Sequence, residues 1–318
     1  MPDIKVAFWN LENLFDVVPN EVFSDFEFTP ANGWDQAAFD AKLANLASVI
    51  QKMHNGAGPD LLGVAEIENE GVAKKLLAAI GLPQLKLAPY QDAPDIRGID
   101  VALFFSTNVF KAPPEFTKGH VVHLRYPTRD IFEAHLELKG GGGELLVYVN
   151  HWPSRRLGQY ESEPARITVA ERCGQLIDAR LKMGRSRFLG PPKPTIQQLN
   201  DLWNHNVLVL GDFNDQPHDP SILDYLQGSK DLDHLEEVIK PAAGGALPEA
   251  KTYLGKRAYL FNWMWRLLAT PDQGTLHFGP ATNSMNLLDQ FMVSRGLYYG
   301  EQKLKIDPAS ASIFKALE

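Results

Sequence analysis

The stretch Val207-Leu-Val-Leu-Gly-Asp-Phe-Asn-Asp-Gln-Pro217 decides the fold of this chain. Four consecutive aliphatic residues before Gly211 predict a strand that is buried on both faces, as in the sheets of α/β proteins. The strand places Asp212 and Asn214 at its carboxyl end, which is where open α/β sheets bind ligands. There a carboxylate can orient a water molecule, and a neutral amide can donate a hydrogen bond to a phosphate oxygen. The same letters also form ordinary turns that close a strand, so the stretch alone is moderately specific.

Length and composition are those of a globular protein with an extensive core. The chain has 318 residues, of which 44% are hydrophobic and 22% are charged, which excludes disordered and fibrous classes. Because no long linker rich in Pro, Gly or Ser divides it, we expect a single domain over 1–318. The formal net charge of -8 argues against strong, sequence-independent clamping of duplex DNA.

The amino-terminal residues and the lengths of the apolar runs predict no membrane segment, and the single cysteine predicts no internal disulfide. The chain enters a strand directly at its amino terminus, and no apolar run approaches the length of a membrane span. We therefore expect no stable membrane insertion, a monomer, and a cytoplasmic location as written, or a secreted or periplasmic one if a leader has been removed. Cys173 lies in a helical pattern and is expected to pack in the core.

Two other predicted strands also end in oxygen-bearing side chains. The strand Ile4–Trp9 is followed by Asn10, and the strand Leu61–Ala65 is followed by Glu66, with a helix predicted over Gln36–His54 between them. Asn10 alone is equally consistent with the cap of a turn, and a lone glutamate at a strand end is usually structural. Together at one sheet edge, oxygen ligands without His or Cys neighbours favour Mg²⁺ or a similar hard cation over zinc.

Arg97 precedes another predicted strand, which ends at Phe105. Its guanidinium suits a bidentate contact with phosphate. A surface ion pair with Asp95 or Asp100 accounts for the same pattern equally well.

A hairpin is predicted where Gly140-Gly-Gly-Gly143 separates two strands, 131–138 and 144–150. The glycines are not a phosphate loop, since neither a helix start nor a Lys-Ser/Thr pair follows them. The second strand leads into Asn150-His-Trp-Pro-Ser-Arg-Arg156. His151 next to a serine and two arginines can bind a phosphate and protonate a leaving group.

The remaining segments supply scaffold and loops. A helix is predicted over 164–181, and the basic, proline-rich segment Arg185–Pro194 is expected to rim the site. The aromatic segment Tyr253–Leu268 fits either an element packed on the core or a substrate-facing wall. A late strand over Leu287–Ser294 places Asp289 near its start.

In their order and spacing, five of these segments resemble the endonuclease/exonuclease/phosphatase superfamily, the DNase I-like proteins, and in particular its bacterial branch. The segments are Trp9-Asn-Leu-Glu-Asn13, Leu62-Gly-Val-Ala-Glu66, Asn150-His-Trp-Pro-Ser-Arg155, Gly211-Asp-Phe-Asn214 and Leu288-Asp-Gln-Phe-Met-Val-Ser294. The resemblance implies a four-layer α/β sandwich, with two packed mixed sheets flanked by helices. It also implies phosphoester hydrolysis that depends on Mg²⁺, or on Mn²⁺, by in-line attack of water.

The resemblance also implies roles for individual residues. Glu66 would bind the metal with help from Asn10, and Asp212 would orient or deprotonate the water. Asn214 would hold a phosphate oxygen, and His151 would stabilise the phosphate or assist the leaving group.

Three further residues have supporting roles by the same resemblance. Ser154 and Arg155 match the family less strongly and are expected to contact substrate. Arg97 is a further candidate for such a contact from its own sequence setting. Asp289 corresponds to a carboxylate that, in the family, pairs with the histidine of a later Ser-Asp-His segment.

No histidine follows His277 here. We therefore expect the chain to lack the family's final strand and Ser-Asp-His motif. A naturally degenerate member that binds metal and phosphate but hydrolyses poorly is the alternative.

The leading interpretation is a Mg²⁺-dependent phosphodiesterase acting on nucleic acid. A phosphatase or phosphodiesterase of the phosphoinositide or sphingomyelin type, acting on a small phosphate ester, is the alternative among enzymes.

Overall fold

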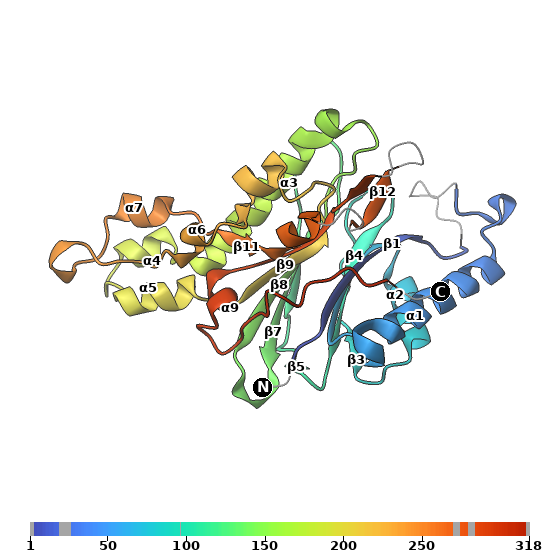
Figure 1. The fold of residues 1–318 in the computed structure, drawn as a ribbon, viewed down its shortest axis with the longest axis horizontal. Coiled ribbons are helices and arrows are strands. Elements are labelled where there is room, and N and C mark those ends of the chain that lie inside the picture. Colours follow the sequence, from blue (N-terminus) through green and yellow to red (C-terminus); the bar gives the residue numbers. More distant parts are fainter. Residues whose placement is uncertain (1–2, 19–26, 96, 270–273, 279–283, 316–318) are drawn as a thin grey trace.

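The computed structural model describes residues 3–18, 27–95, 97–269, 274–278 and 284–315. Within these residues, two mixed sheets pack face to face, and helices cover their outer faces (Figure 1). The expected four-layer α/β sandwich is therefore confirmed. None of the helices in these ranges is both long enough and apolar enough to cross a bilayer.

The first sheet has the strand order β1-β2-β4-β3. Its strands are β1 (Val6–Leu14), β2 (Leu61–Ile67), β3 (Leu85–Leu87) and β4 (Asp100–Ser106). The pair β1 and β2 is parallel, and the other two pairs are antiparallel. β1 continues five residues past the predicted end at Trp9, so Asn10 lies inside the strand.

Two helices cover the outer face of this sheet. They are α1 (Gln36–Gly56) and α2 (Glu70–Ile80), and the side chains of Asp35 and Asn69 cap their first turns. The apolar stripe predicted for α1 packs on the sheet, together with Leu62 and Val64 of β2. A short 3-10 turn, η1 (Pro30–Asn32), precedes α1.

The second sheet has the order β10-β11-β14-β9-β8-β7-β5, and β6 also pairs with β7. Its strands are β5 (Phe110–Lys111), β6 (Thr117–His120), β7 (Ile131–Leu138), β8 (Glu144–His151), β9 (Val207–Asp212), β10 (Gly228–Ser229), β11 (Leu260–Asn262) and β14 (Asp289–Val293). The predicted hairpin is confirmed as β7 and β8, joined through η2 (Lys139–Gly141). β9 lies between β8, to which it is parallel, and β14, to which it is antiparallel.

Helices cover the outer face of the second sheet, the face that points away from the first sheet. They are α3 (Gln159–Leu181), α4 (Arg185–Leu189), α5 (Ile196–Trp203), η3 (Ser221–Tyr225), α6 (Leu232–Glu236) and α7 (Ala250–Gly255). Cys173 is free and fully buried here, as expected. The remaining elements are η4 (Ala243–Gly245), η5 (Trp263–Ala269), the strand pair β12 (Leu276–Phe278) and β13 (Ser284–Asn286), and α9 (Arg295–Tyr299).

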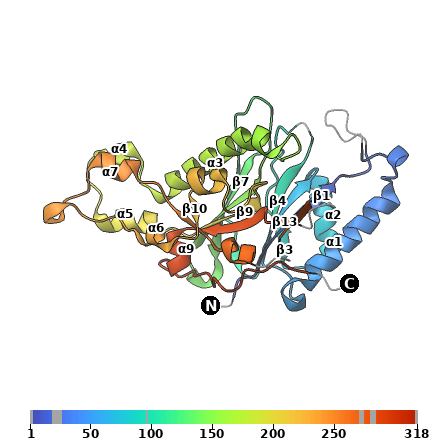
Figure 2. The same cartoon turned by 45° about the horizontal axis from the view of Figure 1, so that its top comes forward.

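The expectation that Arg185–Pro194 rims the site is wrong. Phe188 of this segment stacks on Tyr253 with ring centroids 4.5 Å apart, inside the helical cluster. Figures 1 and 2 show α4 and α7 together at the far end of the molecule from β1 and β2. Burial of Tyr253 also favours core packing for the first part of the aromatic segment.

Small residues let the two sheets approach closely. A Cβ added to Gly63 of β2 would lie 2.5 Å from Cδ1 of Leu210, which belongs to β9 in the other sheet. Leu208, Leu210, Val147 and Val149 fill the space between the sheets and are buried. The four aliphatic residues of β9 are buried because the first sheet packs on one face of this strand and helices pack on the other face.

Gly211 brings β8 and β9 together at the end that carries the polar residues. A Cβ at Gly211 would lie 2.2 Å from the carbonyl oxygen of Asn150, and the residue has a φ of 154°. The register aligns Asn150 with Gly211 and His151 with Asp212. The glycine therefore sets His151 and Asp212 side by side.

We expect Gly211→Ala to destabilise the protein by about 2–3 kcal/mol, because the new methyl group meets backbone that cannot move without separating two central strands. Urea denaturation followed by circular dichroism measures this change. Gly255→Ala is the matched control, since its Cβ would meet no atom within 4 Å apart from its chain neighbours and the backbone of its own helix. Equal stability of the two variants would contradict the expectation.

Candidate active site

The candidate site lies where ends of the two sheets meet, and one hydrogen bond joins them. Nδ2 of Asn10, in β1, donates to Oδ2 of Asp212, at the end of β9, at 3.0 Å. The other carboxylate oxygen, Oδ1, accepts from the backbone N–H of Asn214 at 2.8 Å. Both oxygens of Asp212 are thus held, which fixes the carboxylate relative to both sheets.

Glu66 reaches the same place from a bulge in β2. The pairing of β2 with β4 shifts register between Ala65 and Ile67, and Glu66 has a φ of 62°. A bulge turns a side chain away from the alternation of the strand, and a non-glycine residue in the left-handed region costs about 1–2 kcal/mol. Glu66 Oε1 lies 3.6 Å from His151 Nε2, and the same nitrogen lies 4.0 Å from Asp212 Oδ2.

His151 is buried between these two carboxylates. Burial, reinforced by the positive charges of Arg129 and Arg97, holds the pKa of His151 well below its usual range. The ring is therefore neutral near pH 7 and suits a hydrogen bond to a phosphate oxygen better than donation of a proton. Its Nδ1 is buried and has no hydrogen-bond partner among the described residues.

Asp289 brings a third carboxylate to the site. It begins β14 directly opposite Asp212, and its backbone N–H donates to Oγ1 of Thr275 at 3.0 Å. Burial, and next the charge of Asp212, raise the pKa of Asp289 well above its usual range. Burial also raises the pKa of Asp212, and the charge of Glu66 adds to both shifts.

Burial is the main cause of these two shifts, and repulsion among the three carboxylates adds to it. A hard divalent cation would favour the charged forms of these carboxylates. In the part of the chain that the structure describes, no three side chains among Asp, Glu, His and Cys form a cage around one ion. Mg²⁺ commonly uses one or two carboxylates and completes its octahedron with water and substrate phosphate. Glu66, with the amide of Asn10 on the neighbouring strand, fits such a site.

Asn214 is fixed beside Asp212 in a conformation that non-glycine residues rarely adopt. Its φ is 50°, and its side-chain Nδ2 donates to the carbonyl of Trp152 at 3.0 Å. Such strain is tolerated where surrounding contacts determine the conformation, and it occurs often at functional sites.

Arg97 lies at the edge of the site with its guanidinium on Asn13. Nη2 donates to Oδ1 of Asn13 at 2.8 Å, whereas Asp95 accepts from the backbone N–H of Arg97. Of the two interpretations left open by the sequence, an ion pair of the guanidinium with Asp95 or Asp100 is not formed. Burial and the charges of Arg129 and Arg156 lower the pKa of Arg97, so its charge has incomplete compensation.

Arg129 is part of this region and was missed by sequence reasoning. It is buried, with Nη1 3.1 Å from Oδ2 of Asp95 and Nη2 donating to the carbonyl of Trp152 at 2.8 Å. The available signal was a charged residue just before the buried strand that begins at Ile131, and this signal is weak because such residues are usually solvated.

Ser154 and Arg155 follow His151 but have different environments. Ser154 is half-buried in the loop after β8. The Arg155 side chain is 7% exposed, and its Nη2 contacts Asp215 at 3.0 Å and Asp219 at 2.7 Å. These contacts place its guanidinium among protein groups.

Six predicted residues therefore meet at the joined sheet ends: Asn10, Glu66, His151, Asp212, Asn214 and Asp289. Arg97 lies beside them, and Arg155 is turned into the protein.

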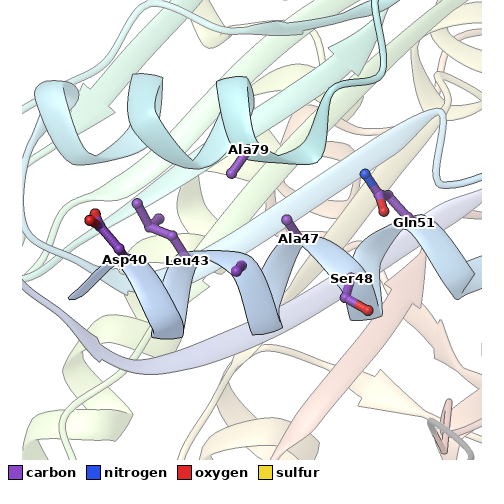
Figure 3. Close-up of a pocket in the computed structure, with 7 residues that line it drawn as sticks. Asp40, Leu43, Ala47, Ser48, Gln51 and Ala79 are labelled. Atoms are coloured by element: carbon purple, nitrogen blue, oxygen red, sulfur yellow. The ribbon is translucent and has the colours of Figure 1, made fainter. Parts of the chain in front are cut away.

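A separate hollow of about 450 Å³ lies between α1 and α2 (Figure 3). Its lining includes Leu43, Ala47, Ser48 and Ala79, with Asp40 as its charged member. The hollow belongs to the outer helical layer and contains none of the predicted site residues.

A model of the endonuclease/exonuclease/phosphatase family matches residues 5–188, more than half of the chain. The chain belongs to this family. Members of the family are phosphoesterases, and the resemblance noted in the sequence is confirmed. A comparison with curated protein sequences finds no match.

Solved structures show the same fold at low sequence identity. An endonuclease/exonuclease/phosphatase family protein from Bacteroides thetaiotaomicron is 16% identical, with a TM-score of 0.52, and the match covers 92% of this chain and 82% of that one. A mannosyl-6-phosphatase of the same organism has the same identity and TM-score, with 92% and 85% covered. TDP2 from D. rerio, complexed with a single-strand DNA product, is 11% identical, with a TM-score of 0.51 and 92% and 83% covered.

We expect Asp289→Asn to raise the free energy of unfolding at pH 8 in the presence of EDTA. Because the folded-state pKa of Asp289 is raised, the stability that its proton contributes is fully present below the unfolded-state pKa, about 4, and is lost as pH rises through the folded-state value. The amide keeps the shape without the charge, so the decline of stability above pH 4 should flatten.

Urea denaturation across pH 4–8 measures this slope. Asp233→Asn, on the exposed surface of α6, is the matched control. A slope that is the same in Asp289→Asn and in the unmodified protein would show that Asp289 carries no buried charge.

Proposed function

We propose that this chain is a divalent-cation-dependent phosphoesterase that cleaves phosphodiester bonds, with nucleic acid as its substrate class, by in-line attack of water. The observation that carries the proposal is the hydrogen bond between Asn10 and Asp212, which brings the polar ends of two sheets into one site. Around it lie His151, Glu66 and Asp289. Membership of a phosphoesterase family supports the same conclusion.

Glu66, helped by Asn10, would hold Mg²⁺ or Mn²⁺, and the bound ion would stabilise negative charge on the phosphate and the leaving oxygen. The fit rests on the oxygen donors that the two sheets bring to one place, Glu66 and Asn10 beside Asp212 and Asp289. The same oxygen donors accept either ion.

In this proposal, Asp212 orients the attacking water and accepts its proton, since a carboxylate can act as a general base. Asn214 and His151 are placed to donate hydrogen bonds to phosphate oxygens, where preorganised donors stabilise charge that develops in the transition state. Arg97, at the edge of the site, and Ser154, in the loop after β8, would contact the substrate.

Nucleic acid is favoured as substrate because Arg97 and the exposed Arg156 place two positive charges near one another, although the whole chain is acidic. Such local positive charge suits a polyanionic backbone. The TDP2 structure with bound DNA product is consistent with this substrate class, whereas the mannosyl-6-phosphatase shows that the same fold also serves a sugar phosphate.

We expect Asp212→Ala to lower kcat for bis-p-nitrophenyl phosphate by about 10²–10⁴-fold, because the variant loses the base that orients the water. The assay contains Mg²⁺ or Mn²⁺, with EDTA as a second control. Supercoiled plasmid, single-stranded DNA and mannose 6-phosphate, tested in parallel, identify the substrate class. Asp233→Ala, an exposed aspartate, is the matched control.

The proposal fails if the unmodified protein hydrolyses none of these substrates with either ion. It also fails if Asp212→Ala retains full activity. Turnover of mannose 6-phosphate with no cleavage of either diester would replace the nucleic-acid proposal with a small phosphate ester.

We expect Arg97→Met to raise KM for single-stranded DNA about tenfold and to change kcat less, since it removes a charge that binds the phosphate before the reaction. A charge-assisted hydrogen bond of this kind contributes about 1.5–3 kcal/mol. Initial rates at several salt concentrations measure the effect. Arg257→Met, which loses an exposed arginine paired with Glu171, should leave KM unchanged, and an equal effect in both variants would assign it to net charge.

A further inference from the structure

We infer that Arg155 is a positioning residue, which with Asp215, Asp219 and Arg166 holds Asn214 in its strained conformation. The resemblance of the sequence to its family predicts a substrate contact for Arg155, and the geometry points to a different role. The inference deepens the proposed function and rests on it, because Asn214 is there a donor to the phosphate.

Asn214 needs external support. Its left-handed φ of 50° is unfavourable for a residue with a side chain. Three contacts hold it: its N–H donates to Asp212, its Nδ2 donates to the Trp152 carbonyl, and its own carbonyl accepts from Nε of Arg155. Asp212 holds the N–H of Asn214, whereas Arg155 holds its carbonyl, so the two contacts fix the backbone on both sides of this residue.

Arg155 is itself held by two carboxylates. Nη2 donates to Oδ1 of Asp215 at 3.0 Å and to Oδ2 of Asp219 at 2.7 Å. The same Asp219 oxygen accepts from the backbone N–H of Gln216 at 2.7 Å. Arg155 therefore spans from the loop after β8 to the loop after β9, and the two bonds of its Nη2 fix the direction of its Nε–H.

A second arginine completes the group from α3. Arg166 is fully buried, and its Nε lies 2.7 Å from Oδ2 of Asp215 as an ion pair. Ser221 Oγ donates to the same oxygen at 2.6 Å. Gln290, next to Asp289 in β14, donates from Nε2 to the Asp215 carbonyl at 2.6 Å. The group thus ties the loop that follows His151 and the loop that carries Asn214 to the strand that carries Asp289.

The charges in this group balance, with two carboxylates facing two guanidinium groups. All four side chains are at most 11% exposed. Removal of one member would leave a buried charge without its partner, which is far less favourable than the intact set. Low exposure, together with the use of both Nε and Nη2 within the protein, distinguishes Arg155 from Arg156, the exposed arginine that follows it.

The test compares steady-state hydrolysis of bis-p-nitrophenyl phosphate, with Mg²⁺ or Mn²⁺, by the unmodified protein and by Arg155→Lys, Asp219→Asn and their double variant. Asp219→Asn keeps the shape of the side chain. Residue 219 does not contact substrate, whether Arg155 positions Asn214 or contacts substrate itself. We expect Asp219→Asn and Arg155→Lys each to lower kcat about tenfold with KM within about twofold. The double variant should be little worse than either, because the residues act as one unit.

A substrate contact predicts another pattern: Arg155→Lys raises KM, and Asp219→Asn changes neither constant. That result would overturn the inference. Thermal unfolding of each variant gives the folded fraction, so that kcat is counted per folded molecule. Ser221→Ala, which removes a single hydrogen bond to Asp215, replaces any variant that fails to fold. Arg257→Met is the surface control.

A crystal structure of Asp219→Asn decides the inference independently of activity. We expect Asn214 to leave the left-handed region and its amide to leave the Trp152 carbonyl. If Asn214 keeps its φ and both contacts, the inference is wrong, whatever the kinetics show. If the unmodified protein has no activity, the proposed function fails, and this structure still tests whether Arg155 positions Asn214.

Discussion

The site depends on a hydrogen bond between an amide and a carboxylate that lie 202 positions apart in the chain. The Asn10 amide donates to Asp212 from one sheet to the other, and the packing of Gly63 against Leu210 lets those sheets approach closely. Apolar burial between the sheets supplies the favourable free energy and is non-directional. The amide supplies direction, because a hydrogen bond weakens steeply when its angle is poor.

Side chains of opposite charge lie on either side of His151 in the site. Glu66, Asp212 and Asp289 gather negative charge on strand ends, whereas Arg129 and Arg97 place positive charge near His151. Burial first, and then these two positive charges, lower the pKa of His151. The protein therefore keeps a neutral imidazole between unlike charges.

Much of this arrangement follows from the sequence, and particular residues show where prediction ends. The buried strand before Asp212 was predictable because four aliphatic residues in a row fit burial on both faces. Strand ends with Asn, Glu and Asp then indicated which side chains would meet. The bulge at Glu66 was not predictable, since its positive φ depends on pairing with β4. The direction of Arg155 depends on Asp219 and Arg166, which no local pattern connects to it.

The close contact of Gly211 with the Asn150 carbonyl has a consequence for how this protein can diversify. It makes the spacing of His151 and Asp212 a property of two hydrogen-bonded strands, so that loop length has no part in setting it. Insertions in the surrounding loops can therefore occur while these two side chains keep their spacing. Asn214 differs, since it lies in the loop after β9 and is held by contacts between loops.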